Sequence, residues 1–383
     1  MQVLVGARIF DGERLLDDHA LVIDGARIAG LTPHAERPRG GRERDLGGGL
    51  IAPGFIDVQV SGGGGALMNE NPSVETVARI AQSHRQFGTT GLMPTLVTDA
   101  PEAMPAAIDA VREARQRWPE VLGIHLEGPF IDPKRRGGHE PQFIREIARA
   151  DVVALAQAKC GAVMMTIAPN RVPAHFVQEL TAHDVLISLG HTEASYAEAS
   201  AALEAGARAF TQLFNAMSQM SGREPGMVGA ALDAEDSFVS IIADGHHIHP
   251  VSLRIALAAK RHDRLMLITD AMPPAAGGPE TFMLQGRKVV RADGSLRLED
   301  GTLAGSALTM DEALRYCTQT IGLGLANALA MAALVPAAFL RRDHELGRVA
   351  PGYLASLVHL SDDLYVRETW IEGRDALSGH GGE

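Results

Sequence analysis

Three short runs of the sequence place a side chain that can bind metal or move protons directly after apolar residues. Glu127 follows the apolar residues of IHLEGPF, His191 those of SLGHT, and Asp270 those of LITDA. One carboxylate and one imidazole are ligands that suit Zn²⁺, Fe²⁺, Co²⁺ or Mn²⁺. A second carboxylate beside such a metal can act as a general base toward water. The runs therefore predict a metal-dependent hydrolytic site, with Glu127 and His191 on the metal and Asp270 moving protons.

Each of these residues also has an ordinary structural explanation. Glu127 could cap a helix or pair with a cation, Asp270 could cap the following loop, and a lone histidine such as His191 often belongs to a loop. His125 lies two residues before Glu127 and shares its face of a strand, so we expect it in the interior rather than on a metal. The functional interpretation rests on the three residues occurring together.

The chemistry depends on elements that bring these side chains to one place. Eight apolar runs alternate with segments long enough for one helix each, and continuous aliphatic runs are typical of strands buried on both faces. This alternation predicts a (β/α)8 barrel of the TIM type. An open doubly wound sheet is the alternative, but no G-x-G-x-x-G follows the first strand. The predicted strands are 55–60, 91–97, 122–127, 163–168, 185–189, 209–213, 239–243 and 265–269.

In a barrel, catalytic groups lie where the strands end, at one mouth. Nearly every predicted strand end carries a side chain that binds ligands or transfers protons. These residues are Asp57, Gln59, Thr95, Glu127, Asn170, His191, Gln212, Asp244 with His247, and Asp270. The set, more than any single member, indicates an active site at this mouth.

The two ends of the chain differ from the middle. Residues 1–52 contain short apolar runs followed by Asp-Gly turn signals, and residues 341–383 repeat this pattern of strands around turns. Within the first segment, residues 32–41 are expected to form a polar loop. We predict one small β-sandwich domain built from 1–52 and 341–383, and a barrel domain over 53–340.

Composition narrows the possible partners. The 383 residues carry 35 Lys+Arg against 47 Asp+Glu, a formal net charge of −12, so no basic surface for nucleic acid or an anionic membrane is expected. Two cysteines cannot build a disulfide framework or a cysteine-rich zinc site. The first residues lack the pattern of a signal peptide, and the uncharged segment 321–340 is rich in Ala and Gly and contains Asn327 and Pro336. We expect a cytoplasmic protein in which 321–340 forms buried helices.

Eight fragments, in order, resemble the N-acetylglucosamine-6-phosphate deacetylase family of the amidohydrolase superfamily. They are PGFID from Pro53, HLEGP from His125, GHT from Gly190, LFNAM from Leu213, GREPG from Gly222, ADGHH from Ala243, TDA from Thr269 and GSALTM from Gly305. The resemblance runs from end to end. It implies a distorted (β/α)8 barrel with a small β-sandwich from both termini, and a homodimer whose subunits share active sites.

The resemblance also implies roles for single residues. Glu127 and His191 match metal ligands, Asp270 matches the catalytic acid/base, and His139 is expected to contact substrate and to help polarise the acetyl carbonyl. Arg223 is expected to reach the phosphate across the dimer interface. The other implied substrate-binding residues are Gly138, Asn215, Ala216, His247, Leu303, Ala304 and Gly305.

Two positions depart from related patterns. Many amidohydrolases hold a second metal with a His-x-His pair after the first strand, but this chain has Gln59 there, as a vestigial second-metal position. We therefore expect one divalent metal. Zn²⁺ is the first choice, and Fe²⁺, Co²⁺ or Mn²⁺ are alternatives. The family has Thr-His before LFNAM, whose histidine is the third ligand, but this chain has Gln212. A glutamine offers only a neutral oxygen. An engineered knockout, a natural weak-metal variant and a sugar-phosphate-binding pseudoenzyme all fit this change.

The leading hypothesis is metal-dependent hydrolysis of the acetamide of N-acetylglucosamine 6-phosphate to glucosamine 6-phosphate and acetate, in amino-sugar catabolism or cell-wall recycling. Glu127, His191 and Gln212 are the expected metal ligands. One alternative is deacetylation of a related substrate such as N-acetylgalactosamine 6-phosphate, because fold and motifs do not separate epimers. The other is a non-catalytic phosphosugar-binding protein, although retention of Asp270 favours chemistry.

Overall fold

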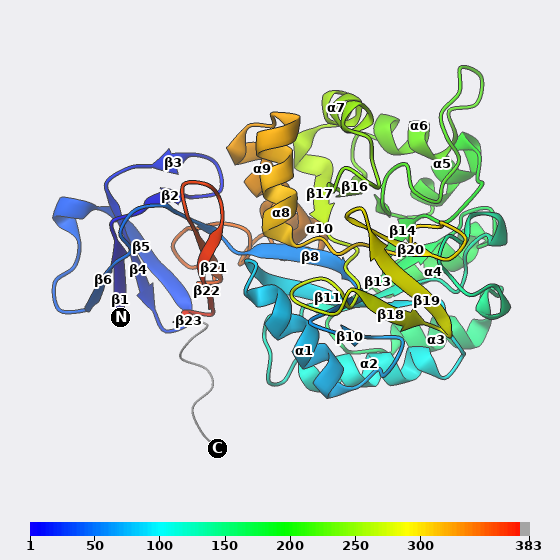
Figure 1. Cartoon of the computed structure of the whole chain (residues 1–383), viewed down its shortest axis with the longest axis horizontal. Helices are drawn as coiled ribbons and strands as arrows, with labels where there is room; N and C mark the ends of the chain where they lie inside the picture. The colour runs from blue at the N-terminus through cyan, green and yellow to red at the C-terminus, as the bar shows by residue number, and fades with distance from the viewer. Residues whose placement is uncertain (376–383) are drawn as a thin grey trace.

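The computed structural model describes residues 1–375, and its centre is a barrel of eight parallel strands (Figure 1). The strands neighbour one another in chain order, and the Asp270 amide donates to the Gln59 carbonyl (3.0 Å), joining the last strand to the first. They are β8 (Phe55–Val60), β11 (Thr89–Val97), β12 (Gly123–Glu127), β13 (Ala162–Ile167), β14 (Leu186–Leu189), β15 (Ala209–Phe210), β16 (Phe238–Ile242) and β17 (Leu265–Ile268). The predicted (β/α)8 barrel is confirmed, although β15 ends earlier than expected.

Helices surround the barrel and begin at recognisable signals. The Ser73 side chain accepts a hydrogen bond from the Thr76 amide at the start of the first helix, and Ser195 forms a capping box with Glu198. The helices are α1 (Val74–Arg85), α2 (Ala103–Ala114), α3 (Arg149–Ala156), α4 (Ala174–Ala182), α5 (Tyr196–Glu204), α6 (Gly226–Asp233), α7 (Pro250–Ala259), α8 (Met310–Arg315), α9 (Leu325–Ala332) and α10 (Leu334–Phe339). A π-helical turn, Tyr316–Ile321, follows α8.

The uncharged segment 321–340 forms the two short helices α9 and α10, which pack against each other and the barrel. Ala328, Leu329 and Phe339 are buried there. Across residues 1–375, no helix combines the length and the apolar character needed to cross a bilayer.

Both ends of the chain build a separate body of two sheets beside the barrel (Figure 1). One sheet has the order β5 (Arg27–Pro33), β4 (His19–Asp24), β1 (Gln2–Val5) and β6 (Arg42–Asp45). The other has the order β23 (Arg374–Asp375), β22 (Val366–Ile371), β21 (Leu357–Leu360), β7 (Leu50–Pro53), β2 (Arg8–Phe10) and β3 (Leu15–Leu16). The buried residues Leu4, Leu21, Ile51 and Trp370 belong to one apolar cluster of this body.

This arrangement confirms the predicted small β-sandwich from both termini, because β21 pairs with β7 although some 300 residues of the sequence separate them. The expected loop over 32–41 begins two residues late, since Thr32 and Pro33 still belong to β5. Residues 376–383 of the predicted small domain lie outside the described residues.

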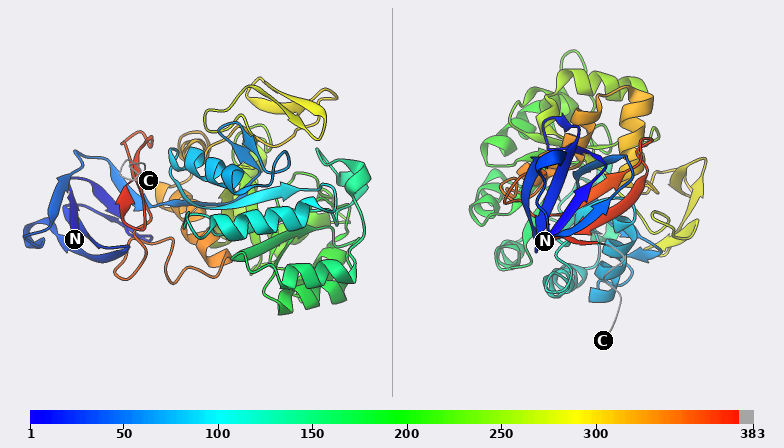
Figure 2. Two further views of the ribbon diagram at one scale, coloured as in Figure 1. Left: turned by 90° about the horizontal axis from the view of Figure 1, so that it is seen from below. Right: turned by 90° about the vertical axis from the view of Figure 1, so that its left-hand side faces the viewer.

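A three-stranded meander follows the last barrel strand and was not predicted. Its strands are β18 (Thr281–Leu284), β19 (Arg287–Ala292) and β20 (Ser295–Leu298), and Figure 2 shows it outside the barrel, away from the terminal sheets. Its buried residues Leu284, Val289 and Leu296 pack with Val97 and Met272 from the barrel. A small hairpin of β9 (Gly62–Gly63) and β10 (Ala66–Leu67) lies nearby, with Leu67 in the same cluster.

Candidate active site at the barrel mouth

A cavity of about 340 Å³ lies where the barrel strands end. Twelve residues singled out from the sequence line it, which places them in one site. They are Glu127, Gly138, His139, His191, Gln212, Asn215, Ala216, His247, Asp270, Leu303, Ala304 and Gly305. Gln59 lies just beneath, fully buried, and contacts the lining carboxylates.

Three of these side chains stand on a sharp turn of the backbone immediately after a strand. His191, Gln212 and Asp270 have φ angles of 48°, 45° and 53°, in the left-handed region that non-glycine residues rarely adopt. Each such residue costs about 1 kcal/mol or more, and this kind of strain concentrates at functional sites. The turns end β14, β15 and β17 where their side chains can enter the cavity.

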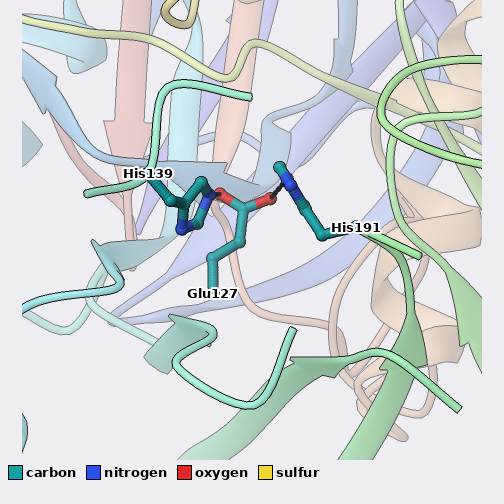
Figure 3. A group of neighbouring side chains, drawn as sticks. All are labelled: Glu127, His139 and His191. Atoms are coloured by element: carbon teal, nitrogen blue, oxygen red, sulfur yellow. Dashed lines mark ion pairs between the residues drawn. The ribbon is translucent and has the colours of Figure 1, made fainter. Parts of the chain in front are cut away.

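The carboxylate of Glu127 lies between the rings of His139 and His191 (Figure 3). Its Oε1 is 3.2 Å from His191 Nε2, and its Oε2 is 4.0 Å from His139 Nε2. One ligand atom from each residue lies within 4.8 Å of the others, and all three residues are buried. This group can hold a metal ion.

The outer nitrogen of each imidazole is held by an acceptor. His191 Nδ1 donates to the Arg135 carbonyl (2.9 Å), and His139 Nδ1 lies 2.8 Å from the hydroxyl of Thr98. Metal-bound histidines commonly donate their other ring N–H in this way, because the bond fixes the tautomer and the ring orientation.

The charges of these groups are set by their burial and by one another. Burial alone would raise the pKa of Glu127, but the hydrogen bond from His191 and the neighbouring imidazoles outweigh it and lower the pKa to about 2. Burial and the neighbouring His191 lower the pKa of His139 to about 3. Near neutral pH the site therefore holds the ionised carboxylate of Glu127 beside the neutral imidazole of His139, and the same carboxylate raises the pKa of His191 despite its burial.

The pKa of Asp270 is shifted in the opposite direction to that of Glu127. Burial and the negative charge of Glu127 raise its pKa from an ordinary 3.8 to about 7, while Gln59 Nε2 donates to its Oδ1 (3.0 Å). The same amide nitrogen donates to Glu127 Oε1 (3.1 Å). One carboxyl group with a lowered pKa beside another with a raised pKa is a common arrangement in active sites. The first stays charged, and the second can accept and donate a proton.

Gln212 reaches the same cluster. Its Nε2 is 2.8 Å from His191 Nε2, so the side chain lies beside the candidate metal site and not in a distant loop. The Gln59 Oε1 atom is also buried there, without a hydrogen-bond partner within residues 1–375.

A second acid–imidazole pair is formed by Asp244 and His247, of which His247 lines the cavity. His247 Nδ1 is 2.6 Å from Asp244 Oδ2, and Asp244 Oδ1 accepts from the amides of His246 and His247. Burial opposes the charged imidazole, but the bond to Asp244 outweighs it and raises the pKa of His247. His247 is thus suited to bind an anion.

Other strand-end residues have structural roles. His125 lies in the barrel interior as expected, with both ring nitrogens on threonine hydroxyls, Thr95 (3.2 Å) and Thr166 (2.8 Å). Asn170 does not line the cavity but links Asp132 to Thr192 through its amide group.

Several residues that line or support the cavity were not predicted from the sequence. Lys134 and Arg135 line the cavity from the loop after β12, and their clustered charge in PKRRGG was a usable signal. Thr98 carries no signal of its own, because its role depends on His139. Arg223 lies apart, exposed on the segment between β15 and α6.

Comparison with known proteins agrees with this geometry. A model of the amidohydrolase family matches residues 50–375, and a model of the NagA composite domain matches residues 1–51. The chain belongs to the amidohydrolase family. As an amidohydrolase it is a hydrolytic enzyme, and Glu127, His139 and His191 are its candidate metal site, as expected of a generally metal-dependent superfamily.

Two curated relatives are similar over nearly the full length of this amidohydrolase. One, N-acetylgalactosamine-6-phosphate deacetylase of Shewanella sp. (strain ANA-3), is 41% identical, covering 97% of this chain and 95% of the relative. Another, N-acetylglucosamine-6-phosphate deacetylase of Haemophilus influenzae, is 33% identical, covering 97% and 98%.

The crystal structure of N-acetylglucosamine-6-phosphate deacetylase from Pasteurella multocida superposes with a TM-score of 0.95 at 33% identity, covering 98% of this chain and 99% of that one. The resemblance to this deacetylase family is confirmed.

Proposed function

We propose that this amidohydrolase hydrolyses the acetamide of N-acetylglucosamine 6-phosphate, releasing glucosamine 6-phosphate and acetate. One observation carries the proposal: a single cavity brings together the buried carboxyl of Asp270, the Glu127–His191 pair and the imidazole of His247. The names of the relatives supply the substrate class.

The donor set fits a divalent cation, Zn²⁺ first and Fe²⁺, Co²⁺ or Mn²⁺ as alternatives. Glu127 is ionised, and the Nδ1 hydrogen of His191 is engaged by the Arg135 carbonyl, which leaves Nε2 to bind metal. Glu127 and His191 would hold the ion. When bound, such an ion polarises a carbonyl and lowers the pKa of water toward about 7.

Asp270 performs the proton transfers. In its ionised form it accepts a proton from the attacking water, and in its protonated form it donates that proton to the amine nitrogen as the C–N bond breaks. Burial raises the pKa of Asp270, which favours the protonated form that this donation needs. The Gln59 amide nitrogen donates hydrogen bonds to both Asp270 and Glu127 and so fixes the position of each carboxyl group.

Other lining residues hold the substrate. The Asp244–His247 pair supplies positive charge for the phosphate, and Asn215 and Ala216 line the same cavity. The run 303–305 also lines the cavity, with Ala304 next to Gly138, and would contact the sugar. Because a dianionic sugar phosphate does not cross a membrane unaided, we place the enzyme in the cytoplasm.

The exposed Arg223 completes the phosphate site of a second subunit in a homodimer. In such a dimer, each chain has a net negative charge but receives a cation at its phosphate site from the other subunit. Mixing Arg223→Ala with Asp270→Asn tests this: after subunit exchange, mixed dimers contain one site with both residues intact, so activity returns. Absence of any recovery, with exchange verified by mass, would show that Arg223 acts within its own chain or not at all.

The direct test is acetate release from N-acetylglucosamine 6-phosphate by the metal-loaded protein. We expect turnover, with kcat/KM at least about 100-fold lower for unphosphorylated N-acetylglucosamine, because the phosphate contacts are lost. N-acetylgalactosamine 6-phosphate is the second substrate to assay, since the 41% identical relative bears that name. Tight binding of glucosamine 6-phosphate without acetate release from either substrate would overturn the proposal.

A further inference from the structure

Two side chains compete for the third position beside Glu127 and His191. One is Gln212, which follows β15, and the other is His139, which lies on the loop after β12. Both line the cavity, and both are buried. The question is which of them directs a lone pair toward the cation.

The hydrogen bonds around His139 leave it with a free lone pair. The Thr98 hydroxyl donates its only hydrogen to the Glu127 carbonyl (3.3 Å), so its oxygen accepts from His139 Nδ1–H (2.8 Å). The unprotonated nitrogen of His139 is then Nε2, the atom that faces Glu127. His191 has the same arrangement, with Nδ1 on the Arg135 carbonyl and Nε2 toward Glu127.

The loop that carries His139 is held by contacts from a distant segment. Arg287 of β19 donates to the Gly138 carbonyl and pairs with Glu140 (3.3 Å), so both neighbours of His139 are fixed. The His139 and His191 rings lie 4.4 Å apart, centre to centre. A ligand held in place before the metal arrives loses less entropy on binding.

Gln212 presents a different atom. Its amide nitrogen faces His191 Nε2 at 2.8 Å, and an amide nitrogen has no lone pair for a metal. If the amide turned, its oxygen would still be a neutral, harder ligand than an imidazole for Zn²⁺.

We propose that His139, and not Gln212, is the third protein ligand of the cation in this chain. The proposal rests on the proposed function only for the presence of a cation at Glu127 and His191. It exchanges the two roles implied by the family resemblance: His139 moves to the metal, and the amide N–H of Gln212 becomes the donor available to the substrate carbonyl.

The experiment measures metal binding by the full chain, without turnover. Zinc affinity is measured by competition with a chromophoric chelator in the unaltered protein and in His139→Gln, Gln212→Leu and His246→Gln. His139→Gln is expected to weaken zinc binding by at least about 100-fold. Gln212→Leu is expected to stay within about 3-fold, as is the exposed matched control His246→Gln.

X-ray absorption spectra of the unaltered zinc protein give a second readout that needs no variant to fold. Two imidazole ligands are expected, from His139 and His191, and a single imidazole would overturn the proposal. Loss of zinc in Gln212→Leu, with or without loss in His139→Gln, would also overturn it. A chain that binds zinc through His139 but releases no acetate would support this inference and refute the deacetylase proposal alone.

Discussion

The barrel buries polar side chains in two layers that behave differently. In the interior layer, His125 and Asp57 are fully buried, and their polar atoms meet threonine hydroxyls and backbone amides. In the mouth layer, His139 and Gln59 are also buried, but His139 Nε2 lies 4.0 Å from Glu127 Oε2, and Gln59 Oε1 has no hydrogen-bond partner within residues 1–375. Burial of a polar side chain therefore does not by itself indicate function. The functional layer is the one whose polar atoms lie beside a cavity and remain free to bind a ligand.

The strongest test of the mouth layer removes its proton carrier. Asp270→Asn keeps the shape of the side chain but cannot accept a proton, so kcat is expected to fall by about 10³-fold or more. Affinity for glucosamine 6-phosphate, measured by calorimetry, is expected to change by less than about 3-fold. Turnover close to that of the unaltered enzyme would show that Asp270 is not the base.

The interior layer is tested through stability. Burial raises the pKa of Asp57 from an ordinary 3.8 to about 7, so the folded chain binds a proton there more tightly than the unfolded chain. This group's contribution is most favourable below about pH 4, and it is lost as pH rises through about 7, by on the order of 4 kcal/mol.

Asp57→Asn removes that titration. The free energy of unfolding, measured by denaturant titration at several pH values, is expected to fall less between about pH 4 and 7 in the variant than in the unaltered protein. Equal slopes in the two proteins would mean that Asp57 is ionised in the folded barrel.

A matched pair of threonines separates the layers directly. Thr98 holds a mouth histidine and Thr166 holds an interior one, each at 2.8 Å. Thr98→Val is expected to lower zinc affinity about 10- to 100-fold with little loss of stability. Thr166→Val is expected to cost about 1–3 kcal/mol of stability and to leave zinc affinity unchanged. The same response in both variants, in either assay, would remove the distinction between layers.

The smallest expected effect concerns His247 and its partner Asp244. Asp244 keeps the pKa of His247 above its ordinary value, so the imidazole stays charged to higher pH. In Asp244→Asn, KM for the phosphorylated substrate is expected to rise about 10-fold or less near neutral pH, with kcat nearly unchanged. The rise is expected to shrink as the pH is lowered, because His247 then also becomes protonated in the variant. A loss independent of pH would indicate a purely structural role for Asp244.

Much of the site was accessible from the sequence because strand ends are local features. The apolar runs before Glu127, His191 and Asp270 identify buried strands, and a parallel barrel brings all such ends to one mouth. The run Asp244-x-x-His247 also carries its pairing in its spacing.

The meander could not be predicted in the same way. Its strand β19, Arg287–Ala292, has only Val289 buried, so its pattern resembles an exposed loop. Only packing against Val97 and Met272 gives it a reason to form sheet at the cavity.

The sequence by itself determined the barrel, the two-ended β-sandwich and the types of side chain that meet at the mouth. These follow from alternating apolar runs, turn signals and the family resemblance, all of which lie along the chain. Tertiary structure alone decided which nitrogen of His139 is free and that Gln212 presents its amide beside His191. The reason is physical: a hydrogen bond such as that from Arg287 to the Gly138 carbonyl joins segments about 150 residues apart, and no local pattern encodes it.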